Sequence, residues 1–368
     1  MKRPVAALAA LTLVLAPLSS AGAAEETVFE PYGYFKLDLA RDSAGSSPGN
    51  FALYVRPHAA GAGQARLSLT ARQTRLGVNI ARGGVKGRIE GDFYGASPEN
   101  KNTLMLRHAY ADIPLGPVRV RAGQGPDIIS PLVPSTLDYG VLYGSGNLGY
   151  RRPQVNITGR AGPYSLTLGL GRNLSDDLDG DTVVDGDAGT PTLQCRFALD
   201  SSGPDGRVQT GVWAHYGRCS CPDDDLRYAN WSAGGDLRVK LGPRLSLEGE
   251  AFWGQNLRQF GGAIYNTDTV DGLRSRGGWL DVRFRANPAW RFGAGAGFED
   301  LEAGGLEGIS DARARNSAYF ANGIYTAAEG VDFGLELSRR RTRYRNRSAD
   351  AATAPTAWRL HGIVRAAF

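Results

Sequence analysis

The chain ends in the stretch Trp358-Arg-Leu-His-Gly-Ile-Val-Arg-Ala-Ala-Phe368. Its apolar residues fall mainly on even positions, starting with Trp358, and its basic residues fall on odd positions, starting with Arg359. A period of two is that of a β-strand, so one face of this strand is apolar and the other is cationic. In a barrel that crosses a membrane, the apolar face meets lipid and the polar face lines an aqueous lumen. The stretch therefore predicts a membrane-spanning strand that ends on an aromatic residue.

The first 23 residues have the pattern of a secretory signal peptide. Lys2 and Arg3 precede an apolar run from Val5 to Leu18, and small residues follow at 21–23. A positive start, an apolar middle and a small-residue finish are typical of such signals. The run is too short for a transmembrane helix, which needs about 20 apolar residues. We therefore predict a secreted chain with residues 1–23 removed, and a single domain over 24–368.

Composition favours an all-β protein with a wet interior. The chain has 50 glycines, 15 tyrosines and only 42% hydrophobic residues. Most apolar residues alternate with polar ones, which suits a water-filled barrel better than a soluble core. Sixteen segments have strand character, at 29–41, 65–80, 84–95, 103–113, 117–124, 147–160, 163–173, 191–200, 206–218, 229–240, 243–256, 275–286, 289–301, 312–326, 329–343 and 355–368.

The connections between these segments alternate in length. Tight Gly- and Pro-rich turns, such as 82–84 and 241–243, alternate with long polar stretches, such as 125–146 and 257–274. Short periplasmic turns and long extracellular loops are the asymmetry of outer-membrane barrels. Sixteen strands enclose an aqueous channel instead of a side-chain-filled core. In the segment 65–80 the alternation changes phase, which predicts a β-bulge.

The basic residues are concentrated on the predicted lumen face. Of the 42 basic residues all but five are arginines, while many aspartates fall in the long loops. Rings of arginine favour anions, because guanidinium groups bind carboxylate or phosphate in a bidentate manner. A pore with only a transverse field and no strong preference is the alternative. The candidate lumen arginines are Arg66, Arg72, Arg75, Arg88, Arg107, Arg119, Arg121, Arg152, Arg283 and Arg285.

The stretch 125–146 is the candidate constriction loop. It holds three prolines and several apolar residues, and long loops without strands of their own are usually functional. Folded inward, it would present four polar side chains to the arginines of the wall. These are Asp127, Ser130, Asp138 and Tyr139. A loop that points outward or contacts another subunit is the alternative.

Several short segments resemble the DcaP-like family of trimeric, dicarboxylate-type porins of the Gram-negative outer membrane. They are Tyr32–Asp38, Thr74–Gly77, Gly87–Tyr94, Leu106–Tyr110, Gly123-Gln124, Tyr150–Gln154 and Gly249–Asn256. The resemblance implies a homotrimer with one pore per protomer and uptake of small anionic solutes such as dicarboxylates. It also implies that the barrel-assembly machinery reads Phe368. By the same match, Arg75, Arg107, Gln124 and Arg152 are the best lumen candidates.

Other sites carry weaker signals. Asp177, Asp179 and Asp181 resemble part of a calcium loop, but they lack its glycine and its final glutamate, so a solvated acidic loop is favoured. Cys219 and Cys221 fall in a predicted outer loop, where a disulfide or a metal site is conceivable. We therefore predict no bound metal or cofactor.

The sequence gives no support for catalysis or for nucleic-acid binding. The four histidines are scattered, and no serine is placed beside a histidine and an acid. The arginines surround a wall instead of forming one patch, which argues against nucleic acid. A structural or adhesive barrel without conductance is the alternative function, and an outer-membrane hydrolase a more remote one. The arginines that begin at Arg339 reach the extracellular rim, where lipopolysaccharide and outer-membrane lipid are the expected partners.

Overall fold

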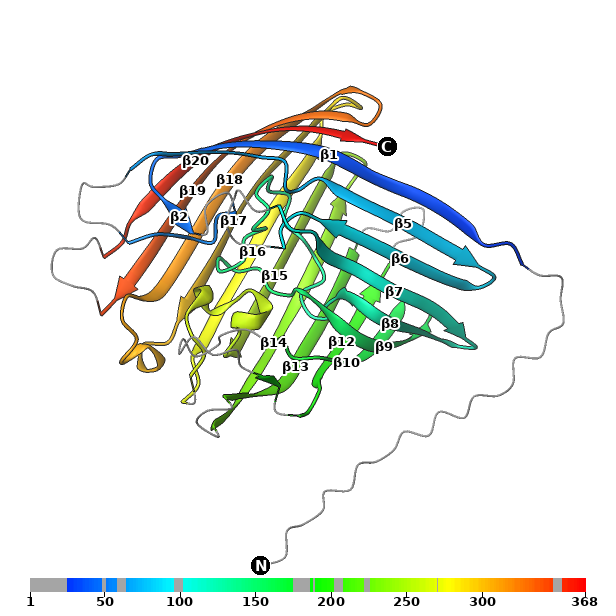
Figure 1. Ribbon diagram of the computed structural model, residues 1–368, viewed down its shortest axis with the longest axis horizontal. Helices are drawn as coiled ribbons and strands as arrows, with labels where there is room; N and C mark the ends of the chain where they lie inside the picture. Colours follow the sequence, from blue (N-terminus) through cyan, green and yellow to red (C-terminus); the bar gives the residue numbers. More distant parts are fainter. Residues whose placement is uncertain are drawn as a thin grey trace, which may run out of the picture.

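The computed structural model forms a closed antiparallel β-barrel (Figure 1). It describes residues 25–47, 51–57, 64–95, 102–174, 186–187, 189–201, 208–221, 226–269, 271–346 and 353–368. The strands are β1 (Val28–Asp42), β2 (Ser46–Ser47), β3 (Tyr54–Val55), β4 (Arg66–Thr70), β5 (Arg75–Arg82), β6 (Val85–Asp92), β7 (Met105–Leu115), β8 (Val118–Pro126), β9 (Arg151–Ala161), β10 (Tyr164–Gly171), β11 (Gly186–Asp187), β12 (Thr192–Asp200), β13 (Val208–Cys221), β14 (Leu226–Leu241), β15 (Leu245–Gln255), β16 (Arg274–Arg285), β17 (Trp290–Leu301), β18 (Ala312–Ala328), β19 (Val331–Arg345) and β20 (Thr356–Ala367). Three short 3₁₀ helices are η1 (Arg258–Phe260), η2 (Ala263–Tyr265) and η3 (Gly304–Leu306).

The wall contains sixteen strands, as the sequence predicts. The main sheet has eighteen members, but β4 and β5 both pair with β1 and form one wall strand, and β11 is a two-residue extension beside β13. β1 also pairs with β20, so the two ends of the chain close the barrel, side by side in Figure 1. Gly33 and Phe368 exchange backbone hydrogen bonds of 3.1 and 3.2 Å at this seam.

The predicted bulge lies between β4 and β5. Asp38 of β1 is opposite Thr70, whereas Tyr34, four residues away on β1, is opposite Arg75, five residues further along the second wall strand. One extra residue is therefore inserted on the β4–β5 side, as in a β-bulge. Across the insertion the inward positions change from even to odd numbers, so that Thr70 and Arg75 both face the interior.

Alternation along the strands separates an apolar outer wall from a polar inner wall. On β20, Trp358 and Leu360 are each 50% exposed, whereas Arg359 and His361 are almost completely buried. Exposed leucine, valine and phenylalanine side chains continue this outer belt around the other strands. The arrangement is that of a membrane barrel, in which the exposed apolar face meets lipid.

No helix in the described part of the chain is long and apolar enough to cross a membrane.

Candidate functional site

The loop between β8 and β9, residues 127–150, lies inside the barrel and is called the inner loop below. Four carboxylates on inward positions of the wall hold the loops that fill the barrel, and are called the anchor wall. They are Glu250 of β15, Asp281 of β16, Glu299 of β17 and Glu336 of β19.

Three members of the anchor wall accept hydrogen bonds from the inner loop. Glu250 accepts the Leu132 backbone N–H at 2.8 Å, and Glu336 accepts the Leu137 N–H at 2.7 Å. Asp281 accepts the backbone N–H of Ser135. A buried backbone N–H without a hydrogen-bond partner is costly, so each carboxylate stabilises the attachment of the loop to the wall.

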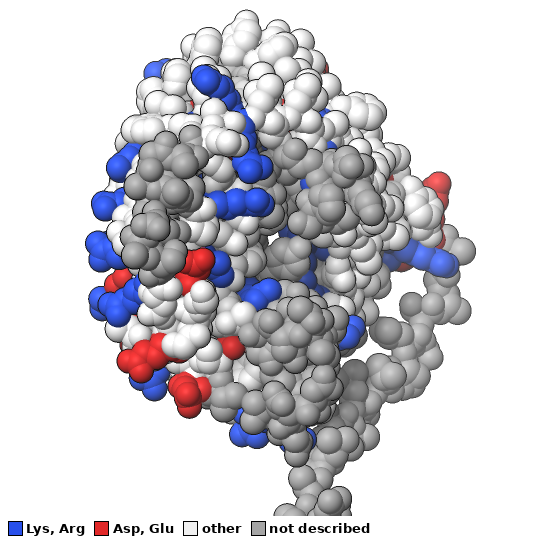
Figure 2. Space-filling model, turned by 60° about the vertical axis from the view of Figure 1, so that its left-hand side comes forward, with Lys and Arg blue, Asp and Glu red and all other residues white. Residues whose placement is uncertain are grey.

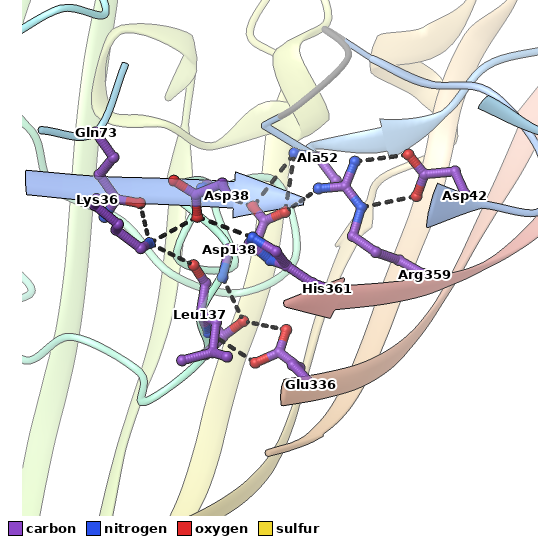
Figure 3. A network of polar contacts seen from close by, with 12 residues as sticks. Lys36, Asp38, Asp42, Ala52, Gln73, Leu137, Asp138, Glu336, Arg359 and His361 are labelled. Carbon is purple, nitrogen blue, oxygen red and sulfur yellow. Dashed lines mark hydrogen bonds and ion pairs between the residues drawn. The ribbon is translucent and has the colours of Figure 1, made fainter. Parts of the chain in front are cut away.

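The tip of the inner loop joins the wall at the barrel seam (Figure 3). Asp138 forms an ion pair with Arg359, which also binds Asp42 of β1 at 2.7 Å. Beside it, Lys36 donates to the carbonyl of Leu137 at 3.4 Å. The loop is therefore attached on several sides of the barrel, through residues far apart in the sequence.

The first residue of the inner loop is held as firmly. Asp127 pairs with Arg152 of β9, and both side chains are completely shielded from solvent. Burial alone would raise the pKa of Asp127, but Arg152 outweighs this effect and holds the pKa below its usual value. Burial likewise opposes ionisation of Asp138, while Arg359 and Arg340 lower its pKa overall. Both carboxylates therefore stay ionised and attached at neutral pH.

Two further loops fold inward, which the sequence did not reveal. In the loop 256–273, Glu299 accepts the Ala263 N–H at 2.7 Å, and three consecutive non-glycine residues, 263–265, have positive φ. Such a backbone is strained and persists only where the surroundings hold it. In the loop 43–56, Ala52 donates to Asp138, and Asn316 of β18 donates to the Leu53 carbonyl at 2.7 Å. The lumen is therefore narrowed by three loops.

A cavity of about 1050 Å³ remains between the inner loop and the wall formed by β1 and β4–β7, and is called the main cavity. Three guanidinium groups border it from the wall, Arg72, Arg75 and Arg107, and this side is called the arginine wall. Arg151, at the start of β9, adds a fourth, and among the described residues that line the cavity Asp138 is the one carboxylate. The surface available to a solute in this space is therefore cationic.

Tyrosines separate the arginines of the main cavity. Tyr94 and Tyr139 stack with ring centroids 3.8 Å apart, and Arg72 lies 4.4 Å above the Tyr94 ring. Arg151 lies 4.5 Å above the ring of Tyr150. Cation–π contact with a tyrosine ring holds a guanidinium in place without neutralising its charge.

The arginines differ in how far their charge is already compensated. Arg107 donates to Glu90 and Asp92 at 2.8 Å each, so its charge is matched by the wall. Arg75 is 3.5 Å from the same Glu90, and its side chain remains about one-fifth exposed. Arg151 forms no ion pair with any residue in the described ranges. Arg75 and Arg151 are therefore best placed to meet an anion.

The remaining predicted arginines line other parts of the interior. Arg119 and Arg121 border a cavity of about 440 Å³ near the 115–117 turn, where Arg121 pairs with Asp112 at 2.8 Å. Arg283 and Arg285 border another, of about 360 Å³. Arg88 donates to Asn79 on the inner wall, at 3.0 Å. Arg66 lies at the loop end of β4, in register with Asp42.

Two predicted lumen residues are corrected. Gln124 points outward, because Gly125 and Arg152 form an inward pair and the neighbouring position must face the other way. Arg152 does face inward, but the inner loop covers it, and its guanidinium lies 4.0 Å from the Phe260 ring. Arg152 is therefore a structural residue and not part of the open surface.

The inner-loop candidates have separate roles. Tyr139 and Asp138 border the main cavity, and Tyr139 also contacts Arg107 at 3.1 Å. Ser130 instead binds Glu250, and Asp127 binds Arg152, so both attach the loop.

The predicted outer-loop position of Cys219 is wrong. It lies on β13, where its sulfur accepts a hydrogen bond from Asn230 at 3.2 Å. Asp177, Asp179 and Asp181 lie outside the described residues, and within those residues no group of side chains is arranged to bind a metal.

No protein-family model and no curated protein matches the chain. Among solved structures, the outer membrane channel DcaP of Acinetobacter baumannii is similar, with a TM-score of 0.77 and 19% identity over 93% of this chain and 97% of that one. An anion-selective porin from Comamonas acidovorans has a TM-score of 0.63 and 13% identity, over 93% and 100%. The trimer form of OmpT, an outer membrane protein of Vibrio cholerae, has a TM-score of 0.59 and 10% identity, over 93% and 99%.

At these identities the likeness concerns the fold. The chain has the fold of an outer-membrane porin, which confirms at this level the resemblance to DcaP-like porins. This fold and the exposed apolar belt together place the protein in the outer membrane of a Gram-negative bacterium.

Proposed function

We propose that this protein is a porin that passes small hydrophilic solutes by diffusion and prefers anions such as dicarboxylates, and that it is not an enzyme. The observation that carries the proposal is the main cavity, where four arginines face one aspartate. In a narrow aqueous space with a low-dielectric wall, fixed charges of one sign concentrate the opposite ion. Basic side chains also stand out on the face in Figure 2, along its left-hand edge and toward its middle.

The geometry favours carboxylates over small spherical anions. A carboxylate can accept two parallel N–H groups from one guanidinium, which a halide cannot do. Arg75 and Arg151 border the same cavity, so a solute with two carboxylates has two partners there. The anion-selective porin from Comamonas acidovorans, which shares the fold, adds support by likeness.

A homotrimer is part of the proposal. The resemblance to trimeric DcaP-like porins and the likeness to the trimer form of OmpT support it. The barrel offers a broad apolar surface beside its seam, where Leu67 and Leu69 of β4 are 70% and 63% exposed. A neighbouring protomer could cover this surface as well as lipid can. Light scattering of the protein in detergent would measure the mass of the assembly, and a monomer mass would remove this part of the proposal.

The function is tested by reconstitution in a planar bilayer. Under a tenfold potassium chloride gradient, discrete conductance steps with a reversal potential of the sign for chloride are the expected result. Succinate added to one side should reduce the chloride current, because it would occupy the arginines of the main cavity. A folded, inserted protein without conductance would overturn the channel, and a cation-selective potential would overturn the anion preference alone.

A further inference from the structure

The outer wall carries a groove of about 600 Å³ over β15–β19, which we call the outer groove. Its floor consists of small residues on outward positions: Ala251, Gly278, Ala296 and Ser317. Phe298 and Tyr319, 42% and 54% exposed, border it. Small residues beside large aromatic ones leave a depression on a wall that elsewhere exposes larger apolar side chains.

Three exposed arginines, Arg315, Arg341 and Arg343, also line the outer groove. They point away from the lumen, because Asn316 and Thr342, their neighbours along the strands, are buried on the inner face. None of the three forms an ion pair within the part of the chain that the structure describes. These charges therefore serve neither the pore nor the attachment of the inner loop.

The arrangement of these arginines favours the binding of an anion. Arg315 and Arg343 are directly opposite each other across the β18–β19 pair. Like charges at opposed positions repel, which destabilises the sheet. Asp300 lies opposite Arg315 on the other side but pairs with Arg276 at 3.6 Å, so a further negative group between Arg315 and Arg343 would relieve the repulsion. Arg315 is also held over the groove by its contact with Phe298, 5.7 Å from the ring centroid. A phosphate could bind both groups through paired hydrogen bonds.

The height of the arginines on the barrel matches the surface of the membrane. Tyr325 packs on Trp290, with ring centroids 5.0 Å apart, at the periplasmic ends of their strands. Arg315 is about ten residues further along β18, which at ~3.3 Å per residue and a tilt of ~45° is roughly 23 Å higher. The apolar band of such barrels is about 25 Å tall, so the arginines lie where lipid headgroups begin on the extracellular side.

We propose that the outer groove binds a phosphorylated glycolipid of the outer leaflet, with its phosphate on the three arginines and an acyl chain on the small residues below. Charge, height and an apolar depression beneath the charge together favour a lipid over a free anion. A second copy of the chain seated on the same groove is disfavoured, because Asp300 of β17, the outward carboxylate beside these arginines in the described ranges, already pairs with Arg276. The proposal is independent of the pore, whose arginines face the other side of the wall.

The test uses the full-length protein in a non-ionic detergent, with diphosphoryl lipid A as the probe and native mass spectrometry as the readout. Each basic residue near an anionic lipid contributes about fivefold to binding. The triple variant Arg315→Ser, Arg341→Ser, Arg343→Ser should therefore lose about a hundredfold in affinity. Arg218→Ser, an exposed outward arginine at the loop end of β13, is the matched control and should retain lipid A.

A second variant distinguishes binding in the apolar groove from binding by the arginine charges. Ala251→Phe fills the floor and leaves every arginine in place, so it should weaken lipid A but not inorganic phosphate. Unchanged conductance in a planar bilayer would establish that each variant is folded. Equal losses in the triple variant and in Arg218→Ser would overturn the proposal. So would competition by millimolar phosphate with no effect of Ala251→Phe, or a change of oligomeric state in the triple variant without any loss of lipid A.

Discussion

The arginine wall and the anchor wall both consist of inward residues of a membrane barrel. The arginine wall borders open space, whereas the anchor wall binds loops. On β4–β7, guanidinium groups border open space, and Arg75 keeps part of its surface in water. On β15–β19, carboxylates such as Glu336 are completely buried under the inner loop. On these two parts of the wall, the inward carboxylates therefore bind loop backbone, whereas the inward guanidiniums border space open to solute.

The physical reason is the backbone of the inner loop. A loop inside a barrel carries N–H groups that need acceptors, and a carboxylate can accept several at once. Glu336 receives both the Leu137 N–H and the Thr136 hydroxyl. A guanidinium has no acceptor, so the loop cannot attach to the arginine wall in this way and a cavity remains there. Four experiments test this contrast.

The largest effect is expected from Glu336→Leu. The variant leaves the Leu137 N–H and the Thr136 hydroxyl without their acceptor, at a cost of roughly 1–3 kcal/mol per buried group. The loop should therefore visit displaced states more than tenfold as often, which single-channel recordings would register as added substates of higher conductance. The control is Asp332→Leu, since Asp332 also faces inward on β19 but binds Arg291 and Thr326 instead of the loop. Similar recordings from both variants would refute the anchor wall.

Arg75→Ser tests the arginine wall. One unit charge at about 4 Å in water contributes about 1 kcal/mol, so the chloride-to-potassium permeability ratio should fall up to about fivefold. Adding Arg107→Ser should extend the shift toward cations, because Glu90 and Asp92 lose their partner. Reversal potentials measure both. Arg88→Ser is the matched control, since Arg88 is an inward arginine that does not border the main cavity. An unchanged ratio in the double variant would remove these arginines from the solute path.

A milder substitution on the anchor wall is Glu250→Gln. The amide retains one acceptor oxygen for the Leu132 N–H, but its NH₂ group cannot accept from Ser130 or from the Trp279 indole. We expect a smaller change than in Glu336→Leu, of roughly 1 kcal/mol, visible as moderately noisier open-channel current. A larger effect than that of Glu336→Leu would mean that geometry, not acceptor number, governs loop attachment.

The smallest effect is expected from pH. Asp127 and Asp138 have lowered pKa values, so their contribution is complete above the usual carboxyl range near 4 and is lost only as pH falls through the lowered values. The contribution of these two carboxylates to loop attachment should therefore stay constant between pH 8 and pH 5. Recordings of Asp138→Asn beside the unchanged protein over this range would test the sign, and a difference between the two proteins that shrinks already at pH 6 would contradict it.

The sequence determined the barrel. A period of two with an apolar outward face follows from the membrane, which imposes the same requirement on every strand. This is why sixteen segments, the bulge before Arg75 and the inward arginines could be identified from local pattern alone. The same alternation argues against Gln124 as a lumen residue. Arg119 and Arg121 place the odd-numbered residues of β8 on the inner face, so Gln124 faces outward.

Which inward charges remain open to the lumen depends on how the loops fold inside the barrel. Arg75 and Arg152 look equivalent in the sequence, but the inner loop buries Arg152 against Asp127 and leaves Arg75 beside the main cavity. The anchor carboxylates were missed for the same reason, since Glu336 meets its partner Leu137 across 199 residues. A strand pattern records only the side of the wall on which a residue lies. What it meets there depends on how the loops fill the lumen, which no local period encodes.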